Sequence, residues 1–413
     1  MIIDSNKEIA PAGWEKDNSI IKVIGVGGGG CNAVNYMYKK NIRGCSFIVC
    51  NTDAQALRNS EVPMKIQMGE GGLGAGTDPT AGRNAALESQ DQIARLVLDS
   101  GTQMLFITAG MGGGTGTGAS PVIAKMAKDR GILTVAVVTI PFKNEGNESQ
   151  SKAIDGIHEL EKNVDALLII NNEKLYQFFG DTLIQEAFPK ADEVLATAVR
   201  GIIEVINRHG YINVDFQDVC KMMRNSGMAL MGSGEGTGPN RLQDAVRGAF
   251  ESPLLNDFDL KTSKNVLVNI TTGNNEQGAK MSDLEKIDEM ISSYTGDANR
   301  FKKGIIWEDD PEFGDKIRIT AIVTGFEMDL GELGLDKNLG NLVIIDEGFQ
   351  WKEPADQQEI SLPASGDTIK IGYNNSDNAR TFNFESDHKP VLCVEAGEKL
   401  SDLEIIPAIR RRH

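Results

Sequence analysis

The sequence predicts an α/β protein in which a parallel β-sheet, covered by helices on both faces, forms the larger of two domains. Short continuous apolar runs alternate with helical segments between residues 20 and 170, a pattern typical of buried parallel strands. Two glycine-rich loops, 27–30 and 110–118, follow directly on such runs. The 413 residues are too many for one ordinary domain, and further strands and helices beyond residue 225 predict a smaller α/β domain.

The elements of the first domain follow from the buried runs and from the helical stretches between them. The expected strands are 20–26, 46–50, 104–108, 132–140 and 166–170, and the expected helices are 32–40, 80–98, 121–129 and 153–163. Ligands bind sheets of this kind outside the carboxyl ends of the strands, where both glycine loops fall. The sequence therefore predicts a ligand site at that edge of a Rossmann-like sheet.

A long central helix is predicted at 192–208, because apolar residues lie on more than one of its sides. A helix of this kind is buried, here between the two domains. A polar loop at 210–218 and another helix follow. The second domain is expected to contain a glycine-rich run at 232–238, strands at 265–271, 304–307 and 317–324, and a helix at 282–294.

The domain boundaries follow from these elements and from a change of composition near residue 326. The stretch that follows is rich in acidic residues, Gly, Asn and Ser and loses its periodicity, which predicts a disordered acidic linker. The expected organisation is a flexible N-terminus at 1–19, a sheet domain at 20–190, the central helix with its loop at 191–224, a C-terminal domain at 225–325, the linker at 326–401 and a basic peptide at 402–413.

Composition argues against several classes of protein. The net charge of −17 and the pI near 4.8 disfavour a general binder of nucleic acids or anionic membranes. No apolar run approaches the roughly 18 residues of a membrane-spanning helix, and no signal peptide is expected. The five cysteines are scattered, which favours buried or inert thiols in a reducing cytosol. The four histidines lie far apart, so any metal ion is expected to be a hard cation bound by oxygen.

The loop Gly110–Gly118 lies between an apolar run and a helix, which is the layout of a phosphate-binding loop. Glycines let the backbone approach the anion, and the N–H groups at the start of the helix point at it. The earlier run Gly25–Gly30 fits the dinucleotide pattern G-x-G-x-x-G, and Asp53 lies where an NAD ribose would need an acid.

A third glycine-rich loop, 71–79, favours a mononucleotide with three phosphates over a dinucleotide. The sequence contains no G-x-x-x-x-G-K-[ST] motif, so this is not a P-loop protein. Backbone amides and Mg²⁺ bound to the phosphates are therefore expected to balance the phosphate charge, without a direct metal site on the protein.

Three polar residues, Asn213, Asp215 and Asp218, lie in the loop after the central helix. One interpretation is structural: Asp215 caps the next helix and Asp218 lies in its first turn. The other is catalytic, but the carboxylates lie at the far end of the central helix from the glycine loops. They reach a bound phosphate only if a second subunit completes the site.

Several motifs, taken in order, resemble the tubulin/FtsZ family of GTPases over roughly residues 18–325 and at the extreme C-terminus. The most specific is Gly112-Gly-Gly-Thr-Gly-Thr-Gly118. The others are 25–32, 51–57, 74–76, Pro141-Phe142 with Glu145-Gly146, Asn172, Phe188 with Asp192, Asn213-x-Asp215-x-x-Asp218, and 231–234. The resemblance implies a tubulin-like fold that binds GTP or GDP with Mg²⁺ and hydrolyses GTP on assembly.

The resemblance also implies roles for individual residues. Phe188 stacks on guanine, and Asp192 accepts hydrogen bonds from its N1–H and its amino group, a donor pair that adenine does not offer. The other residues that line the nucleotide are Gly28, Gly29, Gly30, Cys31 and Asn32; Ala75 and Gly76 at the outer phosphates; Gly114, Thr115, Gly116 and Thr117 around the phosphates; Ser149; and Glu145 and Asn172 at the ribose.

Members of the family polymerise head to tail, so that Asn213, Asp215 and Asp218 of one subunit cover the GTP of the next and orient the attacking water. The resemblance further implies a cytoplasmic protein at the mid-cell division ring, with no membrane insertion of its own. Its C-terminal peptide Ile406-Pro-Ala-Ile-Arg410 is expected to bind membrane-tethering and regulatory division proteins.

One position departs from the family. Ser149 stands where members commonly carry an arginine near the nucleotide, so a charged planar donor is lost, and Lys152 is a candidate substitute. Two other functions stay open from the residues alone. One is an NAD(P)-dependent oxidoreductase on a Rossmann-like domain, and the other is a scaffold that binds GTP without hydrolysing it.

Overall fold

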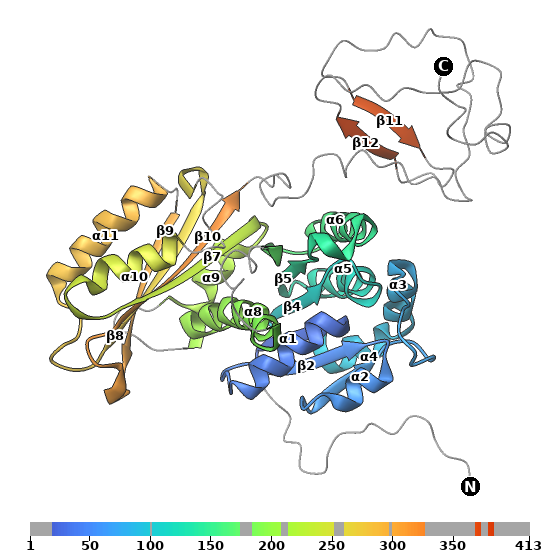
Figure 1. The fold of residues 1–413 in the computed structure, drawn as a ribbon, viewed down its shortest axis with the longest axis horizontal. Helices are drawn as coiled ribbons and strands as arrows, with labels where there is room; N and C mark the ends of the chain where they lie inside the picture. Colours follow the sequence, from blue (N-terminus) through green and yellow to red (C-terminus); the bar gives the residue numbers. More distant parts are fainter. Residues whose placement is uncertain are drawn as a thin grey trace. The chain divides into compact units, whose positions relative to one another are not determined.

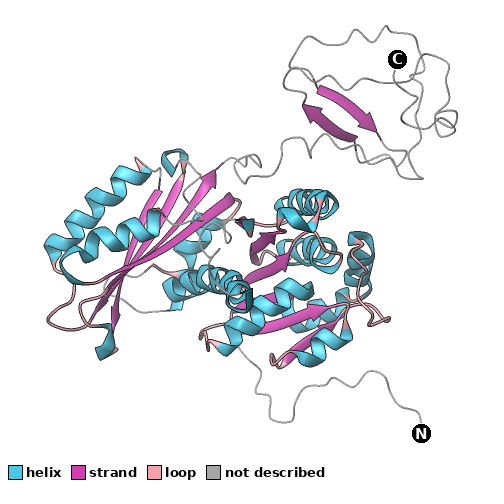
Figure 2. Ribbon diagram, in the orientation of Figure 1, coloured by secondary structure: helices cyan, strands magenta, loops and turns pink. Residues whose placement is uncertain are grey.

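The computed structural model describes residues 19–99, 101–173, 184–207, 214–251, 260–296, 300–326, 368–372 and 379–383. The chain divides into two compact units, Met1–Asp336 and Lys337–His413. The first unit contains a ten-stranded sheet with helices on both faces (Figures 1 and 2). The predicted α/β class is confirmed.

The N-terminal half of this sheet is parallel. Its strands are β1 (Ile21–Val26), β2 (Ser46–Asn51), β3 (Met64–Gln67), β4 (Met104–Gly110), β5 (Leu133–Ile140) and β6 (Ala166–Asn171). Their spatial order is β3-β2-β1-β4-β5-β6. Every residue of β1 is buried, as are all residues of β4 except the last. Burial on both faces explains why these strands appear in the sequence as continuous apolar runs.

The C-terminal half continues the same sheet through β7 (Gly227–Gly236), β10 (Ile317–Phe326), β8 (Asn265–Gly273) and β9 (Arg300–Glu308), in that spatial order. β10 is antiparallel to β7 and β8, whereas β9 is parallel to β8. β7 joins β6 through two residue pairs, Ala166–Gly227 and Leu167–Met228. The two domains expected from the sequence therefore share one sheet.

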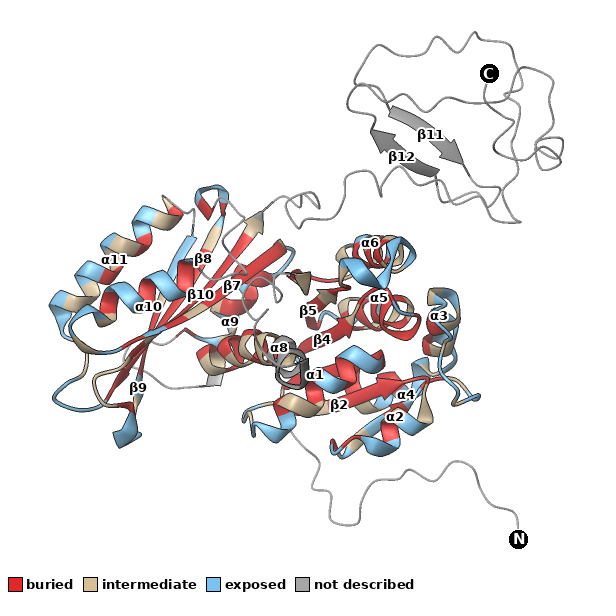
Figure 3. Ribbon diagram, in the orientation of Figure 1, coloured by how far each residue is buried: buried red, intermediate tan, exposed pale blue. Residues whose placement is uncertain are grey.

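Successive side chains of a strand point to opposite faces of the sheet, and each face has its own apolar core. One core packs the sheet against α1 (Gly27–Lys39), α2 (Ala54–Asn59), α8 (Ile184–Asn207) and α9 (Phe216–Met223). The other packs it against α3 (Pro79–Glu88), α4 (Gln90–Ile93), α5 (Thr115–Lys128) and α6 (Asn147–Glu161). A third core lies beneath α10 (Arg241–Phe250) and α11 (Met281–Thr295) in the C-terminal half (Figure 3).

The long central helix predicted at 192–208 is α8, which begins at Ile184. Its residues Val199 and Ile202 are fully buried, and the core around them continues from Ile21 of β1 to Ile322 of β10. The helix therefore packs against both halves of the sheet (Figure 1), as its all-round apolar pattern predicts.

The helices after the glycine loops begin earlier than the sequence predicts. α1 begins at Gly27 instead of residue 32, and α5 begins at Thr115 instead of residue 121. α6 likewise begins at Asn147, and the stretch 80–98 is divided into α3, α4 and a π-helical turn at Ala94–Leu98. The predicted starts of α1 and α5 are wrong because glycine usually marks a loop, whereas here it lets two backbones pack against each other.

Several elements have no counterpart in the prediction, among them α2, β3, α10 and the strand β7. The glycine-rich run 232–238 is mostly strand, because β7 extends to Gly236. A Cβ at Gly236 would overlap the carbonyl oxygen of Arg241 and lie 2.8 Å from its Cα. Glycine at this position lets α10 pack directly on the strand, which is a reason for glycine other than a turn.

The second unit contains an antiparallel pair of strands, β11 (Thr368–Gly372) and β12 (Ala379–Asn383). Both fall within 326–401, the stretch for which the sequence predicts a disordered linker. Their alternating pattern, Thr-Ile-Lys-Ile and Thr-Phe, is that of a short β-hairpin. Phe326, the first residue of the predicted linker, is the last residue of β10. The rest of the linker lies outside the described residues, as do the N-terminal residues 1–18 and the peptide 402–413.

None of the helices in the described ranges combines the length and the apolarity that crossing a bilayer requires.

Candidate functional site

Two helices begin side by side at the carboxyl edge of the parallel sheet, since β1 and β4 are neighbours and α1 and α5 follow them directly. A Cβ at Gly27 would lie 2.8 Å from the backbone nitrogen of Gly116. Neither N-cap residue, Val26 or Gly114, supplies a side-chain cap. Adjacent helix N-termini with uncapped N–H groups form a site for an anion.

The glycines at this edge have two different surroundings. Beneath the edge they are packed tightly: a Cβ at Gly30 would overlap the carbonyl oxygen of Thr108, and one at Gly116 would overlap that of Gly110. Above it, Gly28 and Gly113 are exposed, and a Cβ at either would meet no atom within 4 Å. The backbone therefore forms an open cradle on a rigid base, which suits a large ligand that lies against main-chain N–H groups.

The threonines of the second loop are hydrogen-bonded within the chain. Thr117 Oγ1 accepts a bond from the nitrogen of Gly112 at 2.9 Å, and the hydroxyls of Thr115 and Thr52 lie 2.7 Å apart. Because Thr117 acts there as an acceptor, its own proton stays available to a phosphate oxygen. The hydroxyls thus fix the loop and leave one donor for a ligand.

The third loop, residues 71–78, packs against the start of α5. A Cβ at Gly114 would lie 2.9 Å from both the Cβ of Ala75 and the nitrogen of Asp78. The nitrogen of Gly74 donates to the carbonyl of Thr52 at 3.2 Å, so the loop is also tied to the end of β2. Gly76 is exposed, with a φ of +57° and nothing within 4 Å of its Cβ position. The structure therefore brings the three predicted loops together.

Helix α6 lies beside these loops, but Ser149 contributes its backbone there and not a cation. A Cβ at Gly112 would lie 2.8 Å from the carbonyl oxygen of Ser149. One turn further on, Lys152 Nζ donates to the carbonyl of Thr77 at 3.0 Å and pairs with Glu148 Oε1 at 2.5 Å. Lys152, which the sequence analysis names as a candidate substitute, contacts the third loop.

The two residues expected at the ribose follow β5 and β6. Glu145 accepts a bond from the nitrogen of Phe142 at 2.8 Å through one carboxylate oxygen. Asn172 carries a buried Oδ1 with no hydrogen-bond partner in the described part of the chain. A buried acceptor without a partner is rare in folded proteins, and a ligand hydroxyl would supply one.

Asp192 lies on α8 and is half-buried. Burial raises the pKa of its carboxyl from 3.8 to about 6. No basic side chain pairs with it within the described ranges. A half-buried carboxylate of this kind can accept two hydrogen bonds, so it suits a ligand that offers two N–H donors. The side chain of Phe188, which belongs to the same helix, lies outside the described residues.

The buried thiol of Cys31 faces the protein interior. Its Sγ lies 3.6 Å from the carbonyl oxygens of Gly25 and Cys50. Burial raises the pKa of this thiol to about 12. The thiol is therefore protonated and inert at neutral pH, while the neighbouring Asn32 is exposed on the surface of α1.

The predicted catalytic carboxylates lie at the start of α9. Asp215 caps this helix by accepting a bond from the nitrogen of Asp218 at 2.7 Å, as the structural interpretation expects. Asp218 pairs with Lys302 Nζ of β9 at 3.0 Å. Neither carboxylate has a hydrogen bond or ion pair to the three glycine loops among the described residues, and Asn213 lies outside them. Sequence reasoning missed Lys302, because no local pattern links β9 to α9.

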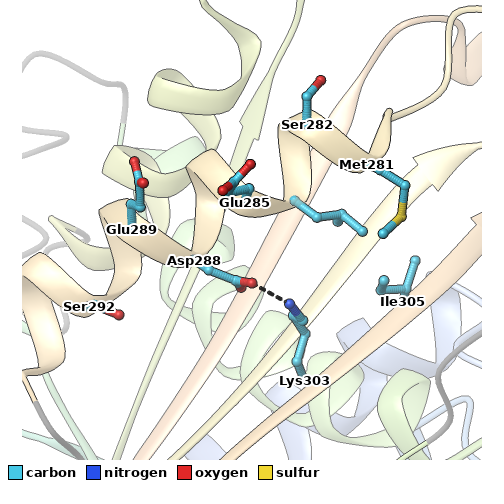
Figure 4. Close-up of a pocket in the computed structure, with 9 residues that line it drawn as sticks. Met281, Ser282, Glu285, Asp288, Glu289, Ser292, Lys303 and Ile305 are labelled. Carbon is cyan, nitrogen blue, oxygen red and sulfur yellow. Dashed lines mark hydrogen bonds and ion pairs between the residues drawn. The ribbon is translucent and has the colours of Figure 1, made fainter.

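A surface pocket of about 1040 Å³ lies elsewhere, between α11 and β9 (Figure 4). Three acidic residues, Glu285, Asp288 and Glu289, line it together with one cation, Lys303, which is paired with Asp288 at 2.5 Å. An acidic lining repels phosphate. This pocket is therefore a poorer candidate for a nucleotide than the open glycine cradle.

Across the described ranges, no group of three or more His, Cys, Asp or Glu side chains is placed to hold a metal ion.

The sequence matches two family models. Residues 20–180 match the Tubulin/FtsZ family, GTPase domain, and residues 227–327 match the FtsZ family, C-terminal domain. Over 404 residues the chain is 40% identical to the cell division protein FtsZ of Porphyromonas gingivalis, covering 95% of this chain and 85% of that protein. Over 400 residues it is 41% identical to FtsZ of Pseudomonas aeruginosa, covering 95% and 96%.

Solved structures agree with these matches. An FtsZ dimer from M. jannaschii has a TM-score of 0.69 at 36% identity, covering 76% of this chain and 91% of that one. GDP-bound CetZ1 from Haloferax volcanii shares the fold, with a TM-score of 0.65 at 18% identity. These matches set aside the oxidoreductase interpretation. With three glycine loops at one edge of a parallel sheet, they show that the chain belongs to the tubulin/FtsZ family of GTPases, and within it to the FtsZ cell division proteins.

Proposed function

We propose that this protein binds GTP at the three glycine loops, polymerises head to tail, and hydrolyses GTP at the contact between subunits. The observation that carries the proposal is the open cradle formed by the N-termini of α1 and α5 and the loop 71–78. The solved FtsZ dimer supports self-association. The polymer is proposed to act in the cytoplasm, at the mid-cell division ring.

In this proposal the phosphates lie against backbone N–H groups of Gly28, Gly29 and Gly30 at α1, and of Gly114–Thr117 at α5. Ala75 and Gly76 approach the outer phosphate from the third loop. The donor set fits an anion because it consists of main-chain amides and hydroxyls without a carboxylate. A Mg²⁺ ion bound to the phosphates would neutralise the remaining charge.

The ribose and base extend toward the β5–β6 end of the same edge. Glu145 and Asn172 follow these two strands, and the unpartnered Oδ1 of Asn172 would accept a bond from a ribose hydroxyl. Asp192 would accept the N1–H and the amino group of guanine, and Phe188 would stack on the ring. Charged acceptors make the stronger hydrogen bonds, so the ionised form of Asp192 selects guanine.

GTP affinity is expected to depend on the ionisation of Asp192. The pKa of about 6 means that the carboxyl is ionised above this pH and protonated below it. Binding to the carboxylate should therefore weaken as the pH falls, by about tenfold per unit below pH 6. Asp192→Asn should remove this dependence, lower GTP affinity at pH 7.5 by about 30-fold or more, and reduce the preference over ATP. Calorimetry from pH 5 to pH 8 measures all three quantities.

Asp129→Asn is the matched control for this experiment, because Asp129 is an exposed carboxylate at the far end of α5. It should bind GTP as the wild type does at every pH. If Asp192→Asn keeps the affinity and the pH dependence of the wild type, Asp192 does not recognise the base.

Hydrolysis is proposed to require a second subunit. Asp215 and Asp218 lie at the start of α9, and among the described residues neither has a hydrogen bond or ion pair to the glycine loops of its own chain. Head-to-tail association would place Asn213, Asp215 and Asp218 of one subunit over the GTP of the next, where a carboxylate orients the attacking water and accepts its proton.

Three measurements test the proposed function as a whole. GTP, and not NADH, should raise the melting temperature, and light scattering should increase with GTP but not with GDP. Phosphate release should accompany the increase in scattering. GTP binding and polymerisation without phosphate release would favour the scaffold that does not hydrolyse GTP.

The C-terminal peptide is proposed to recruit membrane-tethering and regulatory division proteins. Deletion of residues 402–413 is expected to leave GTP hydrolysis and light scattering nearly unchanged, because the deletion removes no residue of the GTP site or of the sheet. Membrane recruitment at mid-cell should be lost, since three isoleucines and three arginines form a compact docking sequence. Fluorescent fusions report recruitment.

The full-length variant Ile406→Ser, Ile409→Ser serves as the control for chain length. It should lose recruitment as the deletion does. A deletion that prevents polymerisation, or that still recruits the protein to mid-cell, would contradict the assignment.

A further inference from the structure

Lys152 is less exposed than its ion-pair partner, although both lie on the surface helix α6. Its side chain is 24% exposed, against 77% for Glu148. Lys152 also makes a second bond, from Nζ to the carbonyl oxygen of Thr77 at 3.0 Å, which spans 75 residues of sequence. A surface ion pair alone contributes little. The contact of interest is therefore the one that joins α6 to the loop 71–78.

The backbone of this loop is unusual. Gly72, Gly74 and Gly76 have φ values of +64°, +90° and +57°, and Thr77 has a φ of +64°. For glycine the left-handed region is inexpensive, but a β-branched residue there is strained and needs external support. The carbonyl that Lys152 binds belongs to this strained residue. Lys152 thus supports the loop at Thr77.

The position of the loop along the sheet edge determines which part of a nucleotide it meets. Asn172 and Glu145 follow β6 and β5, whereas the loop 71–78 follows β3 at the other end of the parallel strand order. The loop also packs on Gly114, the residue before α5. A nucleotide with its ribose at the β5–β6 end therefore directs its last phosphate at this loop.

We infer that Lys152 is a positioning residue that holds the loop 71–78 in its phosphate-facing conformation and so sets the preference for a nucleoside triphosphate over a diphosphate. The inference rests on the proposed nucleotide site. Lys152 acts through the Thr77 carbonyl and needs no direct contact with the ligand. A nucleoside diphosphate does not reach the loop 71–78, so its binding does not depend on the bond between Lys152 and Thr77.

The test is calorimetric binding of GTP and of GDP, below the concentration at which the protein assembles. Lys152→Met keeps the length of the side chain and removes the donor. It should lower the ratio of GTP affinity to GDP affinity by about tenfold, the scale of one lost hydrogen bond, with GDP affinity unchanged. Lys152→Arg keeps a charged donor and should restore most of the ratio.

Lys128→Met is the matched control. Lys128 also donates to backbone carbonyls, those of Val164 at 3.0 Å and Lys162 at 3.3 Å, but away from the glycine loops. It should leave the affinity ratio unchanged, and melting curves should show that all variants are folded.

The outcomes separate the inference from the proposed function. A wild type that binds neither nucleotide would overturn both. Alternatively, the wild type binds GTP, but Lys152→Met keeps the wild-type affinity ratio or loses the same affinity for GTP as for GDP. This result would overturn the positioning role and would not contradict the proposed GTP site.

Discussion

Replacement of Asp218 with alanine is expected to slow GTP hydrolysis by at least about 100-fold while GTP binding stays intact. This is the usual scale for removing a group that transfers a proton in the transition state. Binding survives because Asp218 lies at the start of α9, where it pairs with Lys302 of β9 and has no hydrogen bond or ion pair to the three glycine loops in the described part of the chain. Phosphate release at saturating GTP measures the rate, and calorimetry measures the binding.

If the site is shared between subunits, GTP hydrolysis per subunit in the wild type should rise steeply with protein concentration. A mixing experiment tests the sharing directly. Asp218→Ala has an intact cradle and a defective catalytic loop, whereas Asp192→Asn has an intact loop and a weakened cradle. At a GTP concentration that fills only the intact cradle, an equimolar mixture should be more active than either variant alone.

Asp244→Ala is the matched control, since Asp244 is an exposed carboxylate on α10. It should hydrolyse GTP at the wild-type rate. Wild-type activity that is independent of concentration, together with no gain on mixing, would show that each subunit hydrolyses GTP by itself.

The second large effect is expected at Gly118, where α5 crosses α3. A Cβ at this position would overlap the carbonyl oxygen of Pro79 and lie 2.8 Å from the nitrogen of Arg83. These are backbone atoms of α3, which cannot move aside as a flexible side chain can. Gly118→Ala should therefore lower the free energy of unfolding by about 3 kcal/mol, despite the better helix propensity of alanine. Denaturant titration measures the loss.

Gly113→Ala provides the comparison within the same glycine-rich run, 110–118. Gly113 is exposed, and a Cβ there would meet no atom within 4 Å. Its free energy of unfolding should stay within about 0.5 kcal/mol of the wild type. Equal stability of the two variants would mean that α3 can shift away from α5, contrary to the tight packing described above.

The sequence predicts the parallel strands of the N-terminal half except β3, because strands buried on both faces consist of consecutive apolar residues, as in β4. It places the starts of α1 and α5 too late, because glycine has two uses that look alike in a sequence. Gly113 supports an open loop, whereas Gly116 lets two backbones touch. Only the neighbouring element distinguishes the two, and it belongs to another part of the chain.

The same limit applies to the candidate site. The glycine loops were predictable, since each is a local pattern between a strand and a helix. The partners of the charged residues were not: Lys152 binds the carbonyl of Thr77, and Lys302 binds Asp218, across long stretches of sequence. Such pairs depend on which surfaces the topology brings together. The expected substitute for the missing arginine thus contacts a loop backbone, which no spacing rule could indicate.

The outermost strand of the C-terminal half has a consequence for solubility. β9 is an edge strand, paired only with β8 among the described strands, and such an edge is a template for uncontrolled addition of further strands. Within nine residues it carries Arg300, Lys302 and Lys303. Lys302 and Lys303 are paired with the carboxylates of Asp218 and Asp288, so these charges are held at fixed positions along the edge. Basic side chains on an edge strand disfavour the addition of a further strand, so this edge of the sheet is expected to resist edge-to-edge aggregation.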